Sequence, residues 1–517
     1  MKIIYLGRMG RHRNNPSEVE GDVLELLADN WDDFGFKTIF PTVCRIGGKD
    51  IELGAIRLLI DGVDTSHTRL DEMLSSKNWD GKFPIPDTNY ISVPSEITFY
   101  EQLMGILGAD QAVTVAMNLR DASYLTRVKE DEKAGKMVTS SGFQHSLQRE
   151  RGSQKAYLDG WKVFERQAIA VLDLGFRFND VLGNVSTLEL KFHQVDNLLP
   201  HDVNALIGPN GVGKSRVLHQ IVEDWVVPSK SNAVGFIEKP NLSQIVVVSY
   251  SPFEAFPVDL QDKKLQDQDA YRYYGFQGRQ APSKTGSLGS IRLSHSVPKR
   301  NAASALIECL SNDKRYSVIS DWGQKLRTME LVLRSAFEFD FAAVSVEPNR
   351  RSKSFYCEDP PFCDLSVERG DGDDDVIFDD LSVKVREGEK WKWFIPVVSS
   401  RVECLNEEKL RDHVLFIEGV TFFRGKRALR LSSGQRLFAY VVINILGAIR
   451  RNSLILIDEP ELFLHPTLEI QFVGMLKKIL ANFNSKALLA THSEVIVREI
   501  PSACVHVFEK TDERLAK

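Results

Sequence analysis

The octapeptide GPNGVGKS, from Gly208 to Ser215, has the residue types that hold a phosphate chain, in the P-loop pattern G-x-x-x-x-G-K-[ST]. Its glycines allow backbone N–H groups to turn towards phosphate oxygens without a clash from a Cβ atom. The segment after it predicts a helix, whose positive N-terminal end favours an anion. In this pattern Lys214 reaches the terminal phosphates and the Ser215 hydroxyl ligates Mg²⁺. The predicted nucleotide-binding residues here are Gly208, Pro209, Asn210, Gly211, Val212, Gly213, Lys214, Ser215 and Arg216.

A second candidate group follows the apolar run SLILI, which ends in Asp458 and Glu459. A run that is apolar at every position indicates a strand buried on both faces, as in the middle of a parallel sheet. Ligands bind at the carboxyl ends of such strands. We therefore predict that Asp458 holds Mg²⁺, directly or through water, and that Glu459 is the general base for an attacking water. The alternative is an exposed acidic strand end.

The sequence LSSGQ, with Ser432, Ser433, Gly434 and Gln435 before a long apolar segment, predicts the start of a helix. A small, hydroxyl-bearing helix N-terminus is a second phosphate site. It cannot reach a nucleotide on its own P-loop if the two motifs lie at opposite ends of the domain. In two copies arranged head to tail the loop can reach a nucleotide, because each γ-phosphate then lies between one P-loop and the partner's serine-glycine loop. The alternative is an ordinary helix cap.

Another apolar run, ALLA, ends in Thr491, His492 and Ser493. A histidine at this strand end is expected to contact the γ-phosphate and to help fix the attacking water. The alternative is a structural histidine. The predicted catalytic residues are therefore Lys214, Glu459 and His492.

The P-loop, LSSGQ, ILIDEPE and THS occur in this order, and the sequence resembles the ABC-type P-loop ATPases over about residues 169–239 and 415–508. The resemblance implies ATP and Mg²⁺ as cofactors and a homodimer, or a higher oligomer, that closes on ATP and opens after hydrolysis. Two places depart from the transporter members of the family. Ser433 stands where they carry glycine, and Ser249 and Tyr250 stand where their glutamine reaches the metal. Ser249 is the candidate metal ligand at the second place.

The segment DEPELFLHP, from Asp458 to Pro466, is similar to soluble ATPases allied to SMC, RecF and OLD proteins, and especially to Septu-type ATPases of bacterial phage-defence systems. There the segment resembles the D-loop, which implies that Glu461 and His465 contact the dimer interface. Equally, His465 and Pro466 can simply begin the next helix. The sequence after the THS strand is too short for a nuclease domain of the OLD type. The effector is therefore expected to be a separate, nuclease-like protein or the N-terminal zone.

The order of strand-like and helix-like segments predicts an α/β fold of the ABC ATPase type, with a mixed sheet and flanking helices. Residues 1–168 are expected to form a separate N-terminal α/β domain for partner docking or sensing. Residues 169–517 are expected to form the ATPase domain, with an insertion at about 252–424. Within the first zone, the patterns predict a helix at Val19–Leu27 and an exposed loop at Lys129–Gly152.

Composition restricts the classes of function. The chain has 517 residues and a formal net charge of -6, so it is not basic as a whole. Six scattered cysteines indicate reduced thiols. No apolar stretch reaches the roughly 18 residues that a membrane span needs, which predicts a cytoplasmic protein without a membrane segment. Basic positions in the insertion are either contacts to DNA or RNA phosphates or solvated loop charges: Lys284, Arg292, Lys299, Arg300, Arg350, Arg351 and Lys353.

Together these patterns predict an ATPase that controls a partner effector or a nucleic-acid transaction in anti-phage defence. One alternative is an ATPase of DNA repair or recombination. Another is the nucleotide-binding subunit of a transporter, which usually keeps the glutamine that is missing at Ser249 and Tyr250.

Overall fold

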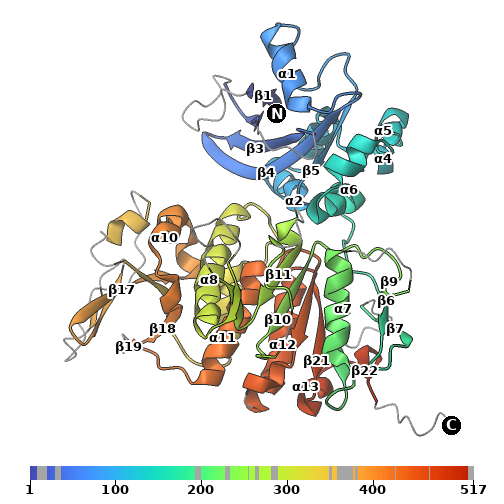
Figure 1. Cartoon of the computed structure of the whole chain (residues 1–517). Helices are drawn as coiled ribbons and strands as arrows, with labels where there is room; N and C mark the ends of the chain where they lie inside the picture. Colours follow the sequence, from blue (N-terminus) through green and yellow to red (C-terminus); the bar gives the residue numbers. More distant parts are fainter. Residues whose placement is uncertain are drawn as a thin grey trace, which may run out of the picture. The chain divides into compact units, whose positions relative to one another are not determined.

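The chain divides into two compact units in a computed structural model of all 517 residues (Figure 1). The first unit comprises Met1–Ile169 together with Arg315–Asp321, and the second comprises Ala170–Lys314 and Trp322–Lys517. The structure describes residues 1–7, 20–28, 36–192, 200–227, 233–253, 256–261, 267–280, 289–347, 352–357, 376–378, 382–425, 427–464 and 466–509.

The first unit is built on a five-stranded sheet in the order β1-β2-β3-β4-β5, in which only β1 and β2 are parallel. Its strands are β1 (Lys2–Tyr5), β2 (Val23–Leu26), β3 (Ile39–Ile46), β4 (Lys49–Ile60) and β5 (Tyr90–Pro94). Its helices are α1 (Ser66–Ser75), α2 (Thr98–Leu107), α3 (Ala109–Asn118), α4 (Ala122–Arg127), α5 (Glu132–Met137), the π-helix η2 (Phe143–Leu147) and α6 (Arg151–Phe164). Apolar side chains of the strands and helices share one core.

Two sequence predictions for this unit are wrong. The predicted helix Val19–Leu27 contains the strand β2, which is buried at all four positions and pairs with β1 and β3. Sheet pairing outweighs the weak helical pattern of this short segment. The predicted loop Lys129–Gly152 contains α5, η2 and the start of α6. Asp131 caps α5 by accepting a hydrogen bond from the backbone N–H of Ala134 at 2.8 Å.

Residues 315–321 belong to the first unit although they come from the middle of the chain. The side-chain amide of Gln102 donates to the carbonyl oxygen of Arg315 at 3.0 Å. Gly105 lies so close to this segment that a Cβ atom there would be 2.2 Å from the carbonyl oxygen of Val318. No pattern in the sequence assigns this segment to the first unit.

The second unit contains a six-stranded sheet in the order β11-β10-β20-β21-β8-β22, and every neighbouring pair is parallel. The strands are β8 (Val203–Ile207), β10 (Gln244–Ser249), β11 (Tyr271–Tyr274), β20 (Ser453–Asp458), β21 (Lys486–Thr491) and β22 (Val505–Val507). β10 and β20 are buried at every position. Their continuous apolar runs are therefore those of central strands in a sheet covered on both faces.

Alternate residues of these strands enter two different apolar cores. Ile455 and Ile457 of β20 belong to one core, and Leu454 and Leu456 belong to the other, as the two-residue period of a strand requires. The first core also contains residues of α8 (Ser296–Arg315), α9 (Lys325–Arg334), α11 (Ser433–Ala448) and α12 (Pro466–Asn482). The second also contains residues of α7 (Lys214–Val226), β6 (Leu174–Asn179) and β7 (Val185–Leu190).

The antiparallel strands of this unit lie in separate sheets. β9 (Gly235–Phe236) joins β6 and β7, and β12 (Gln277–Arg279) pairs with β13 (Ile291–Leu293). A six-stranded antiparallel sheet runs in the order β15 (Val376–Phe378), β16 (Val383–Glu387), β17 (Lys390–Val397), β14 (Phe341–Val346), β18 (Val420–Arg424) and β19 (Arg427–Ala428). The remaining α-helices among the described residues are α10 (Glu407–His413) and α13 (Glu494–Arg498), and short 3-10 helices lie between the elements. Residues 252–424, expected as an insertion, also contribute β11 to the edge of the parallel sheet.

The predicted α/β fold, with flanking helices, is confirmed. Its parallel and antiparallel strands are distributed over different sheets of the second unit, whereas the sheet of the first unit is itself mixed. Among the described residues, no helix is long and apolar enough to cross a membrane. The described cysteines, Cys44, Cys309, Cys357, Cys404 and Cys504, are free thiols.

Candidate nucleotide site

The P-loop connects the end of β8 to the start of α7. Two of its glycines have positive φ angles, 81° at Gly211 and 98° at Gly213, a backbone region that favours glycine. A Cβ atom on Gly208 would be 2.1 Å from the carbonyl oxygen of Phe508. Glycine is therefore required at these three places by the shape of the loop. Because α7 begins at Lys214, its unpaired N-terminal N–H groups face the loop.

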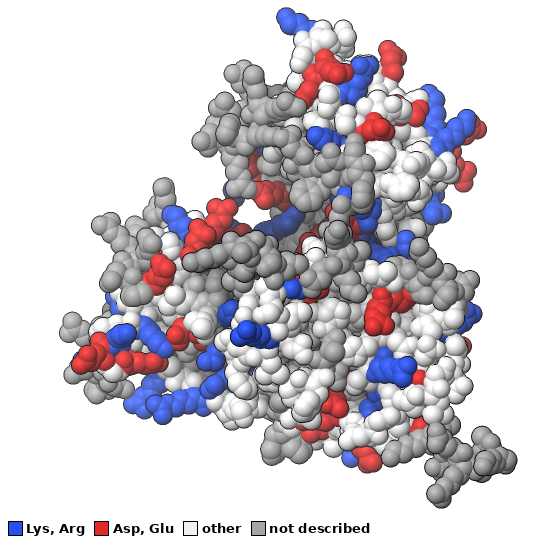
Figure 2. Space-filling view, in the orientation of Figure 1, with Lys and Arg blue, Asp and Glu red and all other residues white. Residues whose placement is uncertain are grey.

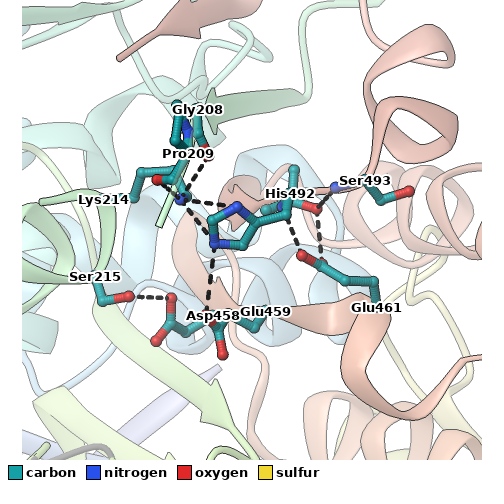
Figure 3. A network of polar contacts seen from close by, with 10 residues as sticks. Gly208, Pro209, Lys214, Ser215, Asp458, Glu459, Glu461, His492 and Ser493 are labelled. Atoms are coloured by element: carbon teal, nitrogen blue, oxygen red, sulfur yellow. Dashed lines mark hydrogen bonds and ion pairs between the residues drawn. The ribbon is translucent and has the colours of Figure 1, made fainter. Parts of the chain in front are cut away.

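Lys214 is the centre of a polar network (Figure 3). Its ammonium group donates to the carbonyl oxygens of Gly208 at 2.9 Å and Pro209 at 3.1 Å. The same Nζ lies 2.9 Å from Nε2 of His492. Lys214 and His492 are 278 positions apart in the chain, so it is the fold that brings these two predicted catalytic residues into contact.

The charge of Lys214 depends on opposing effects. Burial lowers the pKa of its ammonium group below the usual value, and the carboxylates of Glu459, Glu461 and Asp458 act in the opposite direction. A triphosphate has the same sign of charge as these carboxylates. Its binding is therefore expected to strengthen the protonated form of Lys214.

Ser215 and Asp458 meet at the end of the parallel sheet. The hydroxyl of Ser215 donates to Oδ1 of Asp458 at 2.9 Å. Mg²⁺ takes hydroxyl and carboxylate oxygens, usually with phosphate oxygens and waters completing its shell. Among the described residues, no three or more His, Cys, Asp or Glu side chains form a metal site by themselves. Ser215 and Asp458 thus fit an ion that is bound together with a nucleotide.

Glu459 directly follows Asp458 in a left-handed backbone conformation, with φ 48° and ψ 56°. This conformation costs a non-glycine residue roughly 1–2 kcal/mol. Its N–H donates to the carbonyl oxygen of Ala490 at 2.8 Å, and its Oε1 lies 3.7 Å from Nε2 of His492. A cavity of about 20 Å³ borders Asp458 and Glu459, which is room for a single water molecule. The geometry suits a general base.

Glu461 holds the turn that carries His492 (Figure 3). It lies in the short helix η8 (Pro460–Phe463). Its Oε2 accepts a hydrogen bond from the hydroxyl of Thr491 at 2.7 Å, and its Oε1 accepts one from the backbone N–H of His492 at 2.5 Å. The same carboxylate therefore fixes both the strand end and the histidine backbone.

Sequence reasoning missed this role of Glu461, which it assigned to a dimer interface. The spacing of DEPE relative to THS carries no signal for the contact, because β20 and β21 become neighbours only in the folded sheet. Ser493 is held in a similar way, by donating its hydroxyl proton to Glu469 of α12. His465, the second interface candidate, lies outside the described residues.

The end of β10 carries Ser249 and Tyr250, which the sequence resemblance aligns with the glutamine of the transporters. Ser249 pairs in register with Asp458 of β20 and is fully buried, and its hydroxyl has no hydrogen-bond partner among the described residues. Tyr250 is 3% exposed, and its hydroxyl accepts a hydrogen bond from the side-chain amide of Asn444 at 3.0 Å. Asn444 lies on α11, so Tyr250 connects the end of β10 with the LSSGQ helix. Ser249 as a metal ligand stays a prediction.

The LSSGQ sequence forms the N-terminus of α11. Oγ of Ser432 accepts from the N–H of Gln435 at 3.2 Å, and Oε1 of Gln435 accepts from the N–H of Ser432 at 3.1 Å. This capping box satisfies two N–H groups of the helix end. At the other end, the buried Lys325 donates to the carbonyl oxygen of Ile449 at 2.8 Å. Both ends of α11 are thus fixed by side chains.

The predicted residues fall into two groups. Gly208, Lys214, Ser215, Asp458, Glu459 and His492 belong to one cluster (Figure 3). Ser432, Ser433, Gly434 and Gln435 make no hydrogen bond to that cluster among the described residues. Within the P-loop, Asn210 is exposed and Val212 is buried, and Arg216, which directly follows the loop, is exposed.

Comparisons with known proteins agree with this geometry. Residues 427–497 match the family AAA ATPase domain, and this range contains LSSGQ, Asp458, Glu459 and His492. The second unit has the α/β fold of P-loop ATPases. It is 24% identical over 515 residues to Protein ea59 of Escherichia phage lambda, across 94% of this chain and 81% of that protein.

Two solved structures have more distant similarity. The SMC head domain from Thermotoga maritima is 10% identical, covering 66% of this chain and 94% of that chain with a TM-score of 0.25. The SMC head bound to the C-winged helix domain of ScpA is 11% identical, covering 64% of this chain and 92% of that chain with a TM-score of 0.27.

The basic positions proposed for nucleic-acid contact are only partly described. Arg292 and Arg300 are exposed, and Lys299 is half-buried. Lys284, Arg350 and Arg351 lie outside the described residues, as does the side chain of Lys353.

Proposed function

We propose that this protein hydrolyses ATP as an ABC-type ATPase, in a head-to-tail homodimer with two shared nucleotide sites. The observation that carries the proposal is the cluster of Lys214, Ser215, Asp458, Glu459 and His492 at the ends of neighbouring parallel strands. Its groups match the parts of a phosphoryl-transfer site: a lysine, a hydroxyl with a carboxylate, and a general base. The LSSGQ helix makes no hydrogen bond to this cluster within the described chain, which favours its use by a neighbouring copy.

In the proposed reaction, the P-loop N–H groups and Lys214 bind the phosphates and orient the terminal one. Mg²⁺ held by Ser215 and Asp458 would supply charge neutralisation at the phosphate oxygens. Glu459 accepts a hydrogen bond from the attacking water and withdraws its proton. His492, whose backbone is fixed by Glu461, contacts the γ-phosphate with its ring.

Turnover of the Glu459→Gln variant tests the catalytic assignment. The amide cannot accept a proton, so hydrolysis should fall by roughly 100-fold or more while ATP affinity stays near that of the wild type. Lys214→Ala should instead lose ATP binding. Wild-type turnover equal to that of Glu459→Gln would exclude the assignment of the base.

The biological role that we propose is control of a nuclease-like effector in anti-phage defence, in the cytoplasm. The relative in phage lambda supports a phage context. Affinity purification of the full chain from its native host should recover a second protein with nuclease activity that depends on Lys214. Recovery of recombination proteins instead would favour the alternative role in DNA repair.

A second candidate ligand is nucleic acid, which a basic stretch of the sequence favours. Between Glu418 and Asp458 the sequence has no Asp or Glu. Arg424, Arg427 and Arg430 are exposed in the same stretch, and Figure 2 shows Lys and Arg side chains gathered near the place where Figure 1 draws β19. Phosphate contacts by these side chains predict DNA or RNA binding that weakens steeply with salt. Gel-shift measurements at several salt concentrations test this candidate. If no DNA or RNA binds, or if the affinity does not change with salt concentration, nucleic acid is not the ligand.

A further inference from the structure

The chain enters the first unit a second time between two helices of the second unit. α8 leads into Arg315–Asp321, which belongs to the first unit, and the chain returns to the second unit at Trp322 and forms α9. We call Arg315–Asp321 the linking segment. Its Tyr316 and Ile319 side chains are each 5% exposed. Segments that only connect elements usually run over the surface, so the linking segment is packed more closely than a simple connection requires.

Contacts with α2 hold the linking segment in the first unit. Gln102 of α2 is fully buried, and its side-chain amide donates to the carbonyl oxygen of Arg315 at 3.0 Å and to a carbonyl oxygen of β4 at 3.3 Å. Gly105, one turn further along α2, leaves no room for a side chain, because a Cβ atom there would be 2.2 Å from the carbonyl oxygen of Val318. Close-packed groups transmit displacement, so a shift of the linking segment requires a shift of α2.

Asp313 ties the two ends of the linking segment together in the second unit. This buried carboxylate of α8 accepts a hydrogen bond from the indole N–H of Trp322 at 2.9 Å. It also accepts from the backbone N–H groups of Lys325 and Leu326, at 2.6 and 2.8 Å. The first turn of α9 leaves these N–H groups without a partner in the helix. α8 and α9 are therefore joined at the base of the linking segment and are expected to move as a pair.

The same two helices hold the C-terminal end of α11. The buried Lys325 donates to the carbonyl oxygens of Ile449 at 2.8 Å and Gly447 at 3.4 Å. α8 packs against the same end, because a Cβ atom on Gly447 would be 2.6 Å from the Cβ of Ala305, and the two helices lie side by side in Figure 1. α11 begins with the LSSGQ sequence. Direct contacts thus run from the linking segment to the helix that carries this motif.

We propose that the linking segment is a regulatory connection: when ATP binding shifts α11, the shift moves α8 and α9 and, through the linking segment, α2 of the first unit. The inference rests on the proposed function, in which α11 contacts the nucleotide of a neighbouring copy, and it gives the first unit a role. Coupling between two sites is reciprocal. A protein partner that binds the first unit and favours one position of α2 therefore changes the ATP affinity of the dimer by the same factor as ATP changes the affinity for that partner.

Hydrogen–deuterium exchange of the full-length Glu459→Gln protein, with and without ATP and Mg²⁺, tests the connection. ATP should slow exchange at the P-loop and at the start of α11. Exchange in α2 and the linking segment, which contain none of the predicted nucleotide-binding residues, should change by about fivefold or more, the lower end of allosteric coupling. Lys325→Met removes the hydrogen bonds to α11 at similar side-chain length. It should abolish the change in α2 while ATP still protects the P-loop.

Two further variants separate coupling from a general loss of stability. Thr328→Val alters the same helix, but it removes hydrogen bonds to Gly323 and Asn482 instead of those to α11, so it should keep the change in α2. A flexible glycine-serine insertion between Ser320 and Asp321, which are both exposed, should abolish the change because it loosens the linking segment.

Two classes of result are distinguishable. Exchange in α2 and the linking segment that ignores ATP, while ATP protects the P-loop and the start of α11, would overturn the inference. It would also be overturned if Lys325→Met kept the parental response, if the insertion kept it, or if Thr328→Val lost it as fully as Lys325→Met does. A parent in which ATP protects the P-loop but not the start of α11 contradicts the proposed function itself.

Discussion

The carboxylate of Glu461 accepts hydrogen bonds from the hydroxyl of Thr491 and from the backbone N–H of His492, at 2.7 and 2.5 Å. Glu461, two residues after Glu459, therefore fixes the turn at the end of β21. The negative charge of Glu461 strengthens these hydrogen bonds and so helps to hold the His492 ring in place.

Replacing Glu461 with glutamine is predicted to lower ATP turnover with little change in ATP affinity. An amide keeps one acceptor oxygen and loses the charge, and charge-assisted hydrogen bonds contribute roughly 1.5–3 kcal/mol. We expect turnover to fall by about tenfold or more. Steady-state hydrolysis and equilibrium binding of ATP measure the two effects, with Glu499→Gln, an exposed position at the end of α13, as the control. Equal losses in affinity and turnover would contradict a role in positioning His492.

The contact between Tyr250 and Asn444 is predicted to stabilise the connection between β10 and α11. Tyr250→Phe leaves the buried amide of Asn444 without this partner, and an unsatisfied buried polar group costs about 1–3 kcal/mol. Urea unfolding of Tyr250→Phe, Asn444→Leu and the double variant forms a thermodynamic cycle. The double variant should be less destabilised than the sum of the single variants. Strict additivity would show that the two side chains are not coupled.

Gly208→Ala is predicted to disturb the P-loop by a collision, because its Cβ atom would lie 2.1 Å from the carbonyl oxygen of Phe508. Gly211→Ala is the comparison, since no atom lies within 4 Å of its Cβ position and only its φ of 81° is unfavourable. We expect Gly208→Ala to lower both the melting temperature and ATP affinity more than Gly211→Ala does. Thermal melting with and without ATP measures both. If the two variants lowered the melting temperature and the ATP affinity equally, the close approach of Phe508 would not explain why position 208 is glycine.

The first unit is predicted to lose stability as pH rises through the range of about 4 to 7. Burial raises the pKa of the Asp121 carboxyl from 3.8 to about 7, while hydrogen bonds from Tyr124, Tyr100 and Ser123 act in the opposite direction. Between these values the folded state holds a proton that the unfolded chain has released, so the free energy of unfolding falls as pH rises. Below pH 4 both states are protonated and this contribution is fully present.

Asp121→Asn tests this pH dependence, because the one carbonyl oxygen of asparagine can still cap α4, while its amide N–H can donate to the hydroxyl of Tyr100 where Asp121 accepts from it. Denaturant unfolding from pH 4 to pH 8 should show a smaller slope for the variant than for the wild type. Parallel curves would mean that Asp121 does not titrate in this range.

Much of the site could be predicted from the sequence, because its motifs are local. A glycine-rich turn before a helix and an apolar run before two carboxylates each specify their own backbone shape, and the parallel sheet then brings their ends together. The helix start at LSSGQ was predictable for the same reason, since Ser432 and Gln435 form a capping box three residues apart.

Contacts between distant segments were not predictable. The hydrogen bonds between Glu461 and His492 and between Tyr250 and Asn444 form only when distant strands and helices have packed together. The same holds for residues 315–321, which pack in the first unit although they come from the middle of the chain. The error at β2 has a related cause. The short segment VLEL fits a helix or a strand equally well by its pattern, and its two strand neighbours decide the outcome.

The mass of the Glu459→Gln protein in solution with ATP and Mg²⁺ tests the central claim most directly. The account predicts a dimer with ATP and a monomer with ADP, measured by sedimentation equilibrium. It also predicts that adding Ser433→Asp abolishes the dimer but not ATP binding, because an acidic residue suits the start of α11 yet repels a neighbour's γ-phosphate, while Ser433→Ala has a smaller effect. A monomer with bound ATP, or a dimer unaffected by Ser433→Asp, would contradict the account.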